Sequence, residues 1–173
     1  LDEIPNLKNL NLFCIKEKVI IFQQRLFFYK LNLGEQIPSW HGTRCTKKKN
    51  LKSPQWLRNL KTHKKYRFYR FDKFFFSKTY EKNFKLIKDG GWHFTWLGDL
   101  NFIKNKLKSF AHTELNNLSV NDDEFINNCI KNFKPLEPKQ KVKLEKLPLT
   151  DKFLPKFIIK NQKKYKHIIN GEM

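Results

Sequence analysis

Two adjacent carboxylates stand near the start of this sequence, in the stretch Asp2-Glu3-Ile4-Pro5. An acidic pair at a strand end can present oxygen ligands to a hard cation. Such a cation would bridge diphosphate oxygens and neutralise a departing nucleotide. Asp2 is therefore a candidate metal ligand, and Glu3 would lie beside the metal and the donor. The alternative is an ordinary acidic turn, since two residues carry little information by themselves.

A block of glycine and aromatic residues follows later, from Gly90 to Trp96. Paired glycines let a ligand or another chain approach the backbone closely, and the faces of Trp92 and Trp96 suit the C–H surface of a sugar ring. His93 can ligate a metal through its neutral imidazole or move a proton. The alternative for the whole block is a hairpin with core tryptophans and a hydrogen-bonded histidine.

Two further carboxylates are candidate proton acceptors. Asp99 stands at a predicted helix start, and Glu114 follows His112 by two residues. Residues two apart do not face each other on a regular helix, so His112 and Glu114 would meet only at a helix break. A surface pair is the default interpretation, with Glu114 as general base the alternative. The sequence contains no Gly-rich phosphate loop, no Ser/His/Asp order and no HExxH motif.

Composition excludes several classes of protein. The 173 residues fit one domain or part of one, and 39% hydrophobic with 15% aromatic residues exclude a disordered tail. No apolar run approaches the ~18 residues of a membrane span. The three cysteines are far apart and form no CxxC pair, which argues against structural zinc and favours buried or half-buried thiols.

The net charge of +20 invites a nucleic-acid interpretation. However, 31 of the 36 basic residues are Lys and only 5 are Arg, whose planar guanidinium is the better reader of phosphate and base edges. We attribute the charge to lysines spread over solvated faces and expect no specific nucleic-acid partner. The competing hypothesis is a single-strand binder built on residues 64–71, where aromatic side chains could stack bases. That segment lacks the glycines of an RNA-recognition signature.

The elements that must position these residues are a mixture of strands and helices. β-branched and aromatic runs predict strands over residues 26–33, 39–47, 85–88 and 92–97, with a turn at 34–38 and another at 89–91. Apolar spacing and capping residues predict helices over 6–12, from Ser53-Pro54 through Leu60, after Asp99, after Asn121 with Glu124, and over 154–169. Residues 135–150 are rich in Lys, Glu and Pro and predict a surface linker. The mixture indicates an α/β fold with a mixed sheet flanked by helices.

Four blocks of the chain resemble the family 17 glycosyltransferases, the family of β-1,4-mannosyl-glycoprotein 4-β-N-acetylglucosaminyltransferase. The blocks keep the family order and span nearly the whole chain: Asp2-Glu3-Ile4-Pro5, Trp40-His41-Gly42, Gly91-Trp92-His93-Phe94-Thr95-Trp96, and Leu154-Pro155-Lys156-Phe157-Ile158-Ile159-Lys160-Asn161 ending in Tyr165-Lys166-His167-Ile168-Ile169.

This resemblance implies the C-terminal portion of a GT-A-like, Rossmann-like domain. It implies a UDP-GlcNAc donor, a divalent cation, commonly manganese, and an inverting β-1,4 transfer of GlcNAc to a mannosyl hydroxyl of an N-glycan-like acceptor. The site residues implied are Asp2, and alternatively His93, at the metal, with Glu3 adjacent. His93, Glu114 or Asp99 would be the base, and Trp40, Trp92 and Trp96 would be the walls that stack on the acceptor sugar.

The family motif reads Asp-x-Asp-Glu-Ile-Pro, so Leu1 takes the x position and Asp2 the second Asp. We therefore expect the first Asp and the uridine-binding part to precede Leu1, which makes residues 1–173 one partial domain that transfers no sugar alone. The remaining alternative is an inactive remnant. A bacterial or viral enzyme of this kind would work in the cytoplasm, and a eukaryotic one in the Golgi lumen behind a membrane anchor.

Overall fold

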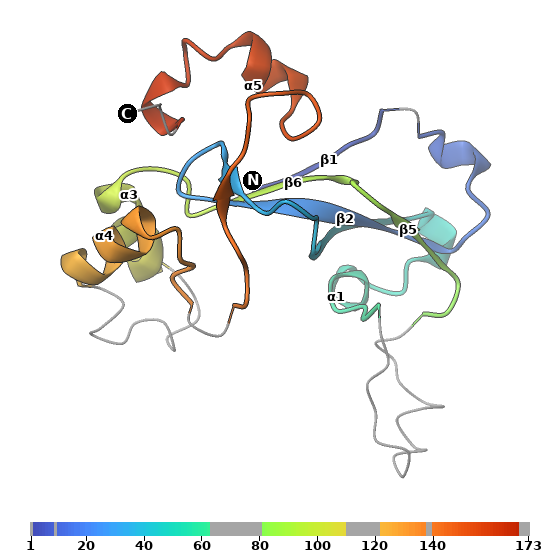
Figure 1. Ribbon diagram of the computed structural model, residues 1–173. Helices are drawn as coiled ribbons and strands as arrows, with labels where there is room; N and C mark the ends of the chain where they lie inside the picture. Colours follow the sequence, from blue (N-terminus) through green and yellow to red (C-terminus); the bar gives the residue numbers. More distant parts are fainter. Residues whose placement is uncertain (1, 9, 63–80, 110–121, 138–139, 170–173) are drawn as a thin grey trace.

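The computed structural model describes residues 2–8, 10–62, 81–109, 122–137 and 140–169, and it has a mixed α/β fold (Figure 1). Within these ranges a seven-stranded mixed sheet is accompanied by four α-helices. The strands are β1 (Glu3–Pro5), β2 (Val19–Phe28), β3 (Leu33–Gly34), β4 (Trp40–Thr46), β5 (Phe84–Ile87), β6 (Gly91–Thr95) and β7 (Glu145–Lys146). The helices are α1 (Pro54–Arg58), α3 (Leu100–Ser109), α4 (Asp123–Lys131) and α5 (Lys156–Lys160), with 3-10 turns η1 (Leu12–Cys14), η2 (Lys48–Asn50) and η4 (Lys166–Ile168).

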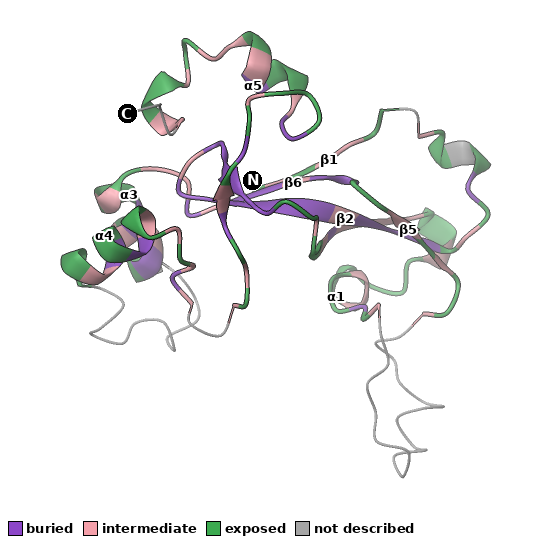
Figure 2. Ribbon diagram, in the orientation of Figure 1, coloured by how far each residue is buried: buried purple, intermediate pink, exposed green. Residues whose placement is uncertain are grey.

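Strand β2 is the centre of the sheet, and nine of its ten residues are buried (Figure 2). Its first half pairs with β4 antiparallel and with β5 parallel, and its second half pairs with β3 antiparallel and with β6 parallel. Because a strand has two edges, β3 and β4 follow one edge of β2 while β5 and β6 follow the other. A strand buried on both faces usually has a continuous apolar sequence. The sequence of β2, VIIFQQRLFF, is apolar except for three residues in its middle.

The outer strands β1 and β7 are short and extend the sheet beyond β6 and β3. Strand β1 pairs antiparallel with β6, so that Glu3 lies opposite His93 and Pro5 lies opposite Gly91. Strand β7 pairs antiparallel with β3. The β1–β6 ladder brings the first residues of the chain to a segment about ninety positions later.

Gly91 lies on β6 directly against the backbone of β1. Its φ is +137°, a conformation that L side chains rarely adopt, and a Cβ atom there would collide with the carbonyl oxygen of Ile4. We expect Gly91→Ala to lower the free energy of unfolding by about 2 kcal/mol, or about 4–8 °C in melting temperature.

The amide protons of Asn6 and Phe94 should also exchange faster in this variant, since they donate to Gly90 O and Asp2 O across the β1–β6 contact. Hydrogen exchange and thermal melts check both expectations. Lys88→Ala, an exposed change in the β5–β6 connection, is the control. Unchanged exchange at both amides would contradict the proposed collision.

The helices lie around the sheet at different places (Figure 1). Helices α3 and α4 pack together at one end of β2, in a core cluster that includes Tyr29, Trp96, Ile103 and Ile126. Helix α5 and the C-terminal turns lie on one face of the sheet, over Phe27 and Phe94, whereas α1 lies on the other side. The apolar spacing predicted for α3 and α4 is confirmed where it is described, because Ile103, Leu107, Ile126 and Cys129 are buried.

Several predicted elements are confirmed. Residues 40–46 and 84–87 form strands, and 91–95 form β6. Ser53 caps α1 by accepting the N–H of Trp56, and Asp99 caps α3 by accepting the N–H of Phe102. The mixed α/β class is likewise confirmed, with the sheet described above.

Other predicted elements differ from the structure. Among the described residues of the range 6–12, only Leu12 is helical, as the first residue of η1. The predicted strand 26–33 is the end of β2, and the chain turns at Tyr29 with a φ of 59°. Glycines 90 and 91 do not make a hairpin, because β5 and β6 both run parallel to β2. Helix α1 ends at Arg58 instead of reaching Leu60, and α4 is capped by Asp122 instead of Asn121.

The last forty residues also differ from the sequence-based expectation. The segment 135–150 contributes three buried leucines, Leu136, Leu144 and Leu147, together with β7. It is therefore packed on the body of the protein rather than being only a surface linker. The single helix predicted over 154–169 is a five-residue α5 followed by turns and η4. Leu154 and Ile158 from that stretch are nevertheless buried.

Candidate functional site

The candidate site is built on the β1–β6 ladder, where Glu3 lies opposite His93. His93 Nδ1 is 3.4 Å from Glu3 Oε1. This Nδ1 atom is buried and has no hydrogen-bond partner of good geometry, so the Glu3 carboxylate is the acceptor that it faces. An imidazole whose Nδ1–H faces a carboxylate keeps the lone pair of a neutral ring on Nε2.

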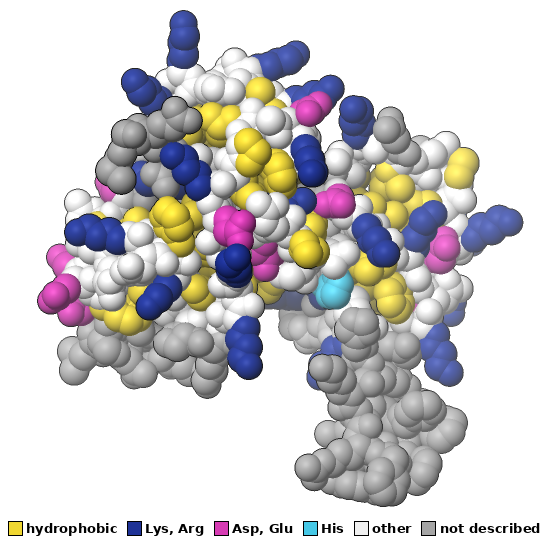
Figure 3. Space-filling view, in the orientation of Figure 1, with side chains coloured by type: hydrophobic (Ala, Val, Ile, Leu, Met, Phe, Trp, Pro, Cys, Tyr) yellow, Lys and Arg dark blue, Asp and Glu magenta, His cyan; other side chains and the backbone are white. Residues whose placement is uncertain are grey.

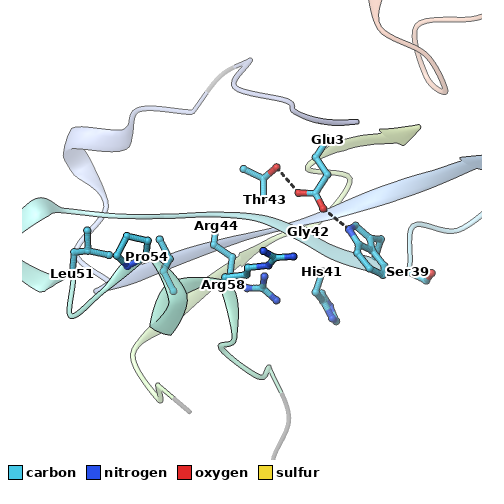
Figure 4. A pocket seen from close by; sticks show the side chains of 11 residues that line it. Glu3, Ser39, His41, Gly42, Thr43, Arg44, Leu51, Pro54 and Arg58 are labelled. Carbon is cyan, nitrogen blue, oxygen red and sulfur yellow. Dashed lines mark hydrogen bonds between the residues drawn. The ribbon is translucent and has the colours of Figure 1, made fainter. Parts of the chain in front are cut away.

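Two side chains of β4 complete the surroundings of Glu3. Trp40 Nε1 donates to Glu3 Oε1 at 2.8 Å, and Thr43 Oγ1 donates to Glu3 Oε2 at 3.1 Å (Figure 4). The Trp40 and His93 rings also lie against each other, with centroids 4.9 Å apart and planes inclined by 40°. Glu3, Trp40, Thr43 and His93 thus form one contact group, called the Glu3 cluster below.

A β-bulge allows Trp40 and Thr43 to reach the same carboxylate. Residues three apart on a regular strand point to opposite faces. The β2–β4 register shifts between Ile21 and Gln23, which pair with Arg44 and His41, so β4 carries one extra residue there. Bulges of this kind redirect side chains. Gln24, fully buried on β2, holds Thr43 with both ends of its amide.

These contacts lower the pKa of the Glu3 carboxyl group. The pKa of Glu3 is lowered to about 2, chiefly by the His93 imidazole that faces it and further by the hydrogen bonds from Trp40 and Thr43, while partial burial opposes the shift. The carboxylate is therefore ionised at any physiological pH.

The lowered pKa of Glu3 predicts an acid-dependent loss of stability. A depressed carboxyl pKa stabilises the fold above the unfolded value of 4.5, and this contribution disappears as the pH falls toward about 2. We expect wild type to exceed Glu3→Gln in free energy of unfolding by about 1–2 kcal/mol at pH 6, allowing for solvent screening, with the difference shrinking between pH 4.5 and pH 2.

Urea unfolding at several pH values measures this difference. Glu17→Gln is the matched control, because the Glu17 side chain has no hydrogen bond or ion pair with any residue in the described ranges. A difference between wild type and Glu3→Gln that stays constant from pH 6 to pH 3 would show that the contacts of Glu3 do not depend on its charge.

Three members of the Glu3 cluster, Glu3, Trp40 and Thr43, form one wall of a pocket of about 880 Å³ between β4 and α1. Figure 4 shows Glu3 at one side of this pocket, with the heads of Arg44 and Arg58 near its centre. The lining combines charged, aromatic and apolar side chains: Glu3, Ser39, Trp40, His41, Gly42, Thr43, Arg44, Leu51, Pro54, Leu57 and Arg58. Trp40 is 38% exposed, so part of its indole is open to a ligand.

No protein-family model, curated protein or solved structure matches this chain. The assignment of function therefore depends on the residues themselves and on how the fold brings them together.

The other aromatic candidates lie elsewhere. Trp92 points to the opposite face of β6 from His93, where its Nε1 donates to Phe153 O at 2.8 Å and its ring packs beside the C-terminal cluster. Trp96 is only 3% exposed and belongs to the core around α3 and α4. In the described structure its ring is therefore packed in the core and is not on a pocket wall. Core packing of this tryptophan was the alternative left open from sequence.

Asp99, another candidate base, is not brought into the Glu3 cluster. The carboxylate of Asp99 caps α3, accepting the N–H of Phe102 at 2.8 Å beyond the end of β6. His112 and Glu114 lie outside the described residues, as does the basic aromatic segment 64–71. On the face shown in Figure 3, the described Lys and Arg side chains are scattered rather than gathered in one patch.

A complete manganese site does not fit the residues around Asp2. The Asp2 side chain is exposed, and its backbone carbonyl accepts the N–H of Phe94. Both Glu3 oxygens already accept hydrogen bonds from Trp40 and Thr43. Among the described residues, no three His, Cys, Asp or Glu side chains gather where they could hold one ion. No described helix is long and apolar enough to cross a membrane.

Sequence reasoning missed three arginines and a threonine near the site. Thr43 holds Glu3, Arg44 and Arg58 line the pocket, and Arg25 holds the loop before β4. The scarcity of arginine was an available signal, since a chain with 31 lysines keeps arginine at only five positions. The contact of Thr43 had no such signal, because it depends on the bulge in β4.

Proposed function

We propose that this chain is the C-terminal, acceptor-side portion of a GT-A-like glycosyltransferase of the family 17 type. In this proposal the enzyme transfers GlcNAc from UDP-GlcNAc to a mannosyl hydroxyl, with inversion, to form a β-1,4 linkage on an N-glycan-like acceptor. The pocket beside the Glu3 cluster would receive the acceptor, with the exposed indole of Trp40 as the wall on which the sugar packs.

The observation that carries the proposal is the convergence of all four family-like blocks on strand β6. Glu3 of the first block and Trp40 of the second contact His93 of the third on one face of the sheet. On the other face, Trp92 donates to the carbonyl of Phe153, directly before the fourth block. Leu154 and Ile158 of that block are buried in the cluster that contains Phe94. Segments that are scattered in sequence thus meet at one place.

In the proposed reaction, His93 is the general base and Glu3 is its positioning residue. With Nδ1 facing the Glu3 carboxylate, Nε2 of the neutral ring is free to accept the proton of the acceptor hydroxyl. The hydroxyl oxygen then attacks the anomeric carbon of GlcNAc as the bond to UDP breaks on the opposite side. The ionised Glu3 stabilises the imidazolium that forms, and the Trp40 ring keeps the imidazole in place.

The donor and the cation belong to the proposal through the family resemblance alone. Asp2 supplies one exposed carboxylate for manganese, which when bound would neutralise charge on the departing diphosphate. The described residues bring no complete set of ligands to Asp2. The reaction steps assigned above therefore concern His93, Glu3 and Trp40 only.

A transfer assay tests the proposal. The full-length product of the gene that encodes this chain is incubated with UDP-GlcNAc, manganese and a mannose-terminated oligosaccharide, and the products are identified by mass spectrometry and NMR. We expect a β-1,4-linked GlcNAc on mannose, and loss of the product in Trp40→Ala. UDP-GlcNAc that stays intact with every mannosyl acceptor, in a protein shown to be folded, would refute the proposal.

A further inference from the structure

Two arginines that make no ion pair with a carboxylate in the described residues, Arg44 and Arg58, line the pocket between β4 and α1. Within the described residues, neither Arg44 nor Arg58 makes an ion pair with a carboxylate, and Arg58 makes no side-chain hydrogen bond. Glu3 is the acidic residue of the pocket lining, but its oxygens are occupied by Trp40, Thr43 and the facing His93. The pocket therefore has spare positive charge directed into it.

Arg44 is half-buried and incompletely paired. One of its terminal nitrogens donates to Leu60 O at 3.2 Å, while its Nε atom is buried without any hydrogen-bond partner. A buried donor without an acceptor is costly, and such positions in native proteins call for a ligand or water. Burial lowers the pKa of the Arg44 guanidinium, opposed by the charge of Glu3.

Arg58 reaches the same space from a different element. It occupies the last turn of α1 and is exposed, and like Arg44 it lines the pocket (Figure 4). Two like charges that line one pocket repel each other, and an anion bound between them would offset that repulsion. Guanidinium groups bind phosphate and carboxylate through paired N–H donors. These two residues are also two of only five arginines in a lysine-rich chain.

We propose that this pocket binds an anionic sugar, with the phosphate or carboxylate of the ligand held by Arg44 and Arg58 and its ring packed on Trp40. The inference rests on the proposed function in treating this ligand as the acceptor, and it narrows the acceptor to an acidic saccharide. Recognition of the anion itself depends only on the geometry of the pocket.

Calorimetric titration of the purified chain at ~0.15 M salt, where exposed charges are screened beyond ~8 Å, tests the proposal. The probes are mannose 6-phosphate, glucuronate, mannose and inorganic phosphate, with UDP in a separate titration. We expect at least one of the two acidic sugars to bind at least about tenfold more tightly than either mannose or inorganic phosphate. Arg58→Gln should weaken that binding by about tenfold or more, and Arg58→Lys should restore part of it.

Lys49→Gln is the matched control, because it removes the same charge from an exposed residue of nearby η2 that does not line the pocket. Arg58 is exposed and unpaired, so its replacement leaves the fold intact. Three results would each overturn the proposal: mannose binding as well as the acidic sugars, inorganic phosphate binding as well as them, or equal losses in Arg58→Gln and Lys49→Gln.

UDP binding that exceeds acidic-sugar binding and depends on Arg58 would also overturn it, since the anion would then be the donor diphosphate. This titration is independent of the transfer assay. Transfer only to neutral acceptors, without acidic-sugar binding, would refute this inference and leave the proposed function standing. Acidic-sugar binding without transfer would refute the proposed function and leave this inference standing.

Discussion

Replacing His93 with alanine is expected to lower the transfer activity proposed for the full-length protein by about 10²–10⁴-fold, because the variant lacks the proposed base for the acceptor proton. The dependence on manganese should stay as in wild type. Added imidazole should restore part of the rate, since the side chain removed leaves space between Glu3 and the Trp40 ring. Rate, manganese dependence and a melting curve are measured for each variant.

Glu3→Gln is the companion variant. It keeps one oxygen acceptor in place of the two that Trp40 and Thr43 use, and it removes the charge that faces His93. Loss of a residue that orients a functional histidine has effects of about 10–100-fold, so the expected loss of turnover is smaller than in His93→Ala. His93→Ala and Glu3→Gln combined should then be little worse than His93→Ala alone, because Glu3 acts through His93.

The other roles of His93 give different results. If it were a metal ligand, His93→Ala would need more manganese, and excess metal would restore the rate. If it were only a packed core side chain, 9% exposed as observed, the variant would melt at a lower temperature with a near-normal rate per folded molecule. Either result would remove His93 from the role of base.

Replacing Arg25 with methionine is expected to lower the free energy of unfolding by about 3 kcal/mol. Arg25 is 5% exposed, and its Nη1 donates to Glu35 O at 2.8 Å and also to the carbonyl of Gln36. Removing it leaves these carbonyls without that donor, at about 1–3 kcal/mol for a buried group. It also removes the cation–π contact with Phe153, worth about 0.5–2 kcal/mol.

The corresponding fall in melting temperature is about 6–12 °C. The ion pair of Arg25 with Asp89 adds little to this total, because the Asp89 side chain is 73% exposed. Lys143→Met is the control, since Lys143 is exposed and pairs only at the surface with Glu145; it should change the melting temperature little. A loss in Arg25→Met no larger than in that control would show that the carbonyls of Glu35 and Gln36 find other donors.

Arg25 also connects the segments that build the site. It joins the loop before β4, which carries Trp40, to Asp89 before β6 and to Phe153 before the fourth family-like block. We therefore expect Arg25→Met to increase the mobility of Trp40, measured as faster hydrogen exchange in residues 35–40. Arg25→Lys keeps the charge but not the planar fork, so it should recover only part of the stability.

The sequence by itself determined the local features of the fold. Ser53 and Asp99 predict where their helices begin, because a side-chain oxygen at a helix start accepts hydrogen bonds from backbone N–H groups of the first turn. The apolar spacing of Ile126 and Cys129 predicts their burial because one helical face must meet the core. Composition indicated a folded chain, and the strand and helix patterns indicated the mixed α/β class. Residue patterns singled out Glu3 and His93, and the family resemblance added Trp40.

Only the tertiary structure decided how these residues meet. Glu3 and His93 are ninety positions apart, and the register of β1 on β6 puts them opposite each other. Local sequence does not encode such a register, since it depends on which strands pair and on the backbone space that Gly91 leaves open. Trp40 and Thr43 both reach the Glu3 carboxylate because of a bulge in β4, and no residue type in the sequence predicts that bulge.

Burial separated residues that the sequence treats as equivalent. Trp40 belongs to the second family-like block, and Trp92 and Trp96 belong to the third. In the structure Trp40 lines the pocket, Trp92 faces the C-terminal turns and Trp96 is in the core. Alternation along β6 sends Trp92 and His93 to opposite faces, and the positive φ of Trp96, 53°, turns the chain toward α3. The arginines were visible in the sequence, but their meeting in one pocket depends on how α1 packs beside β4, which is a property of the folded chain alone.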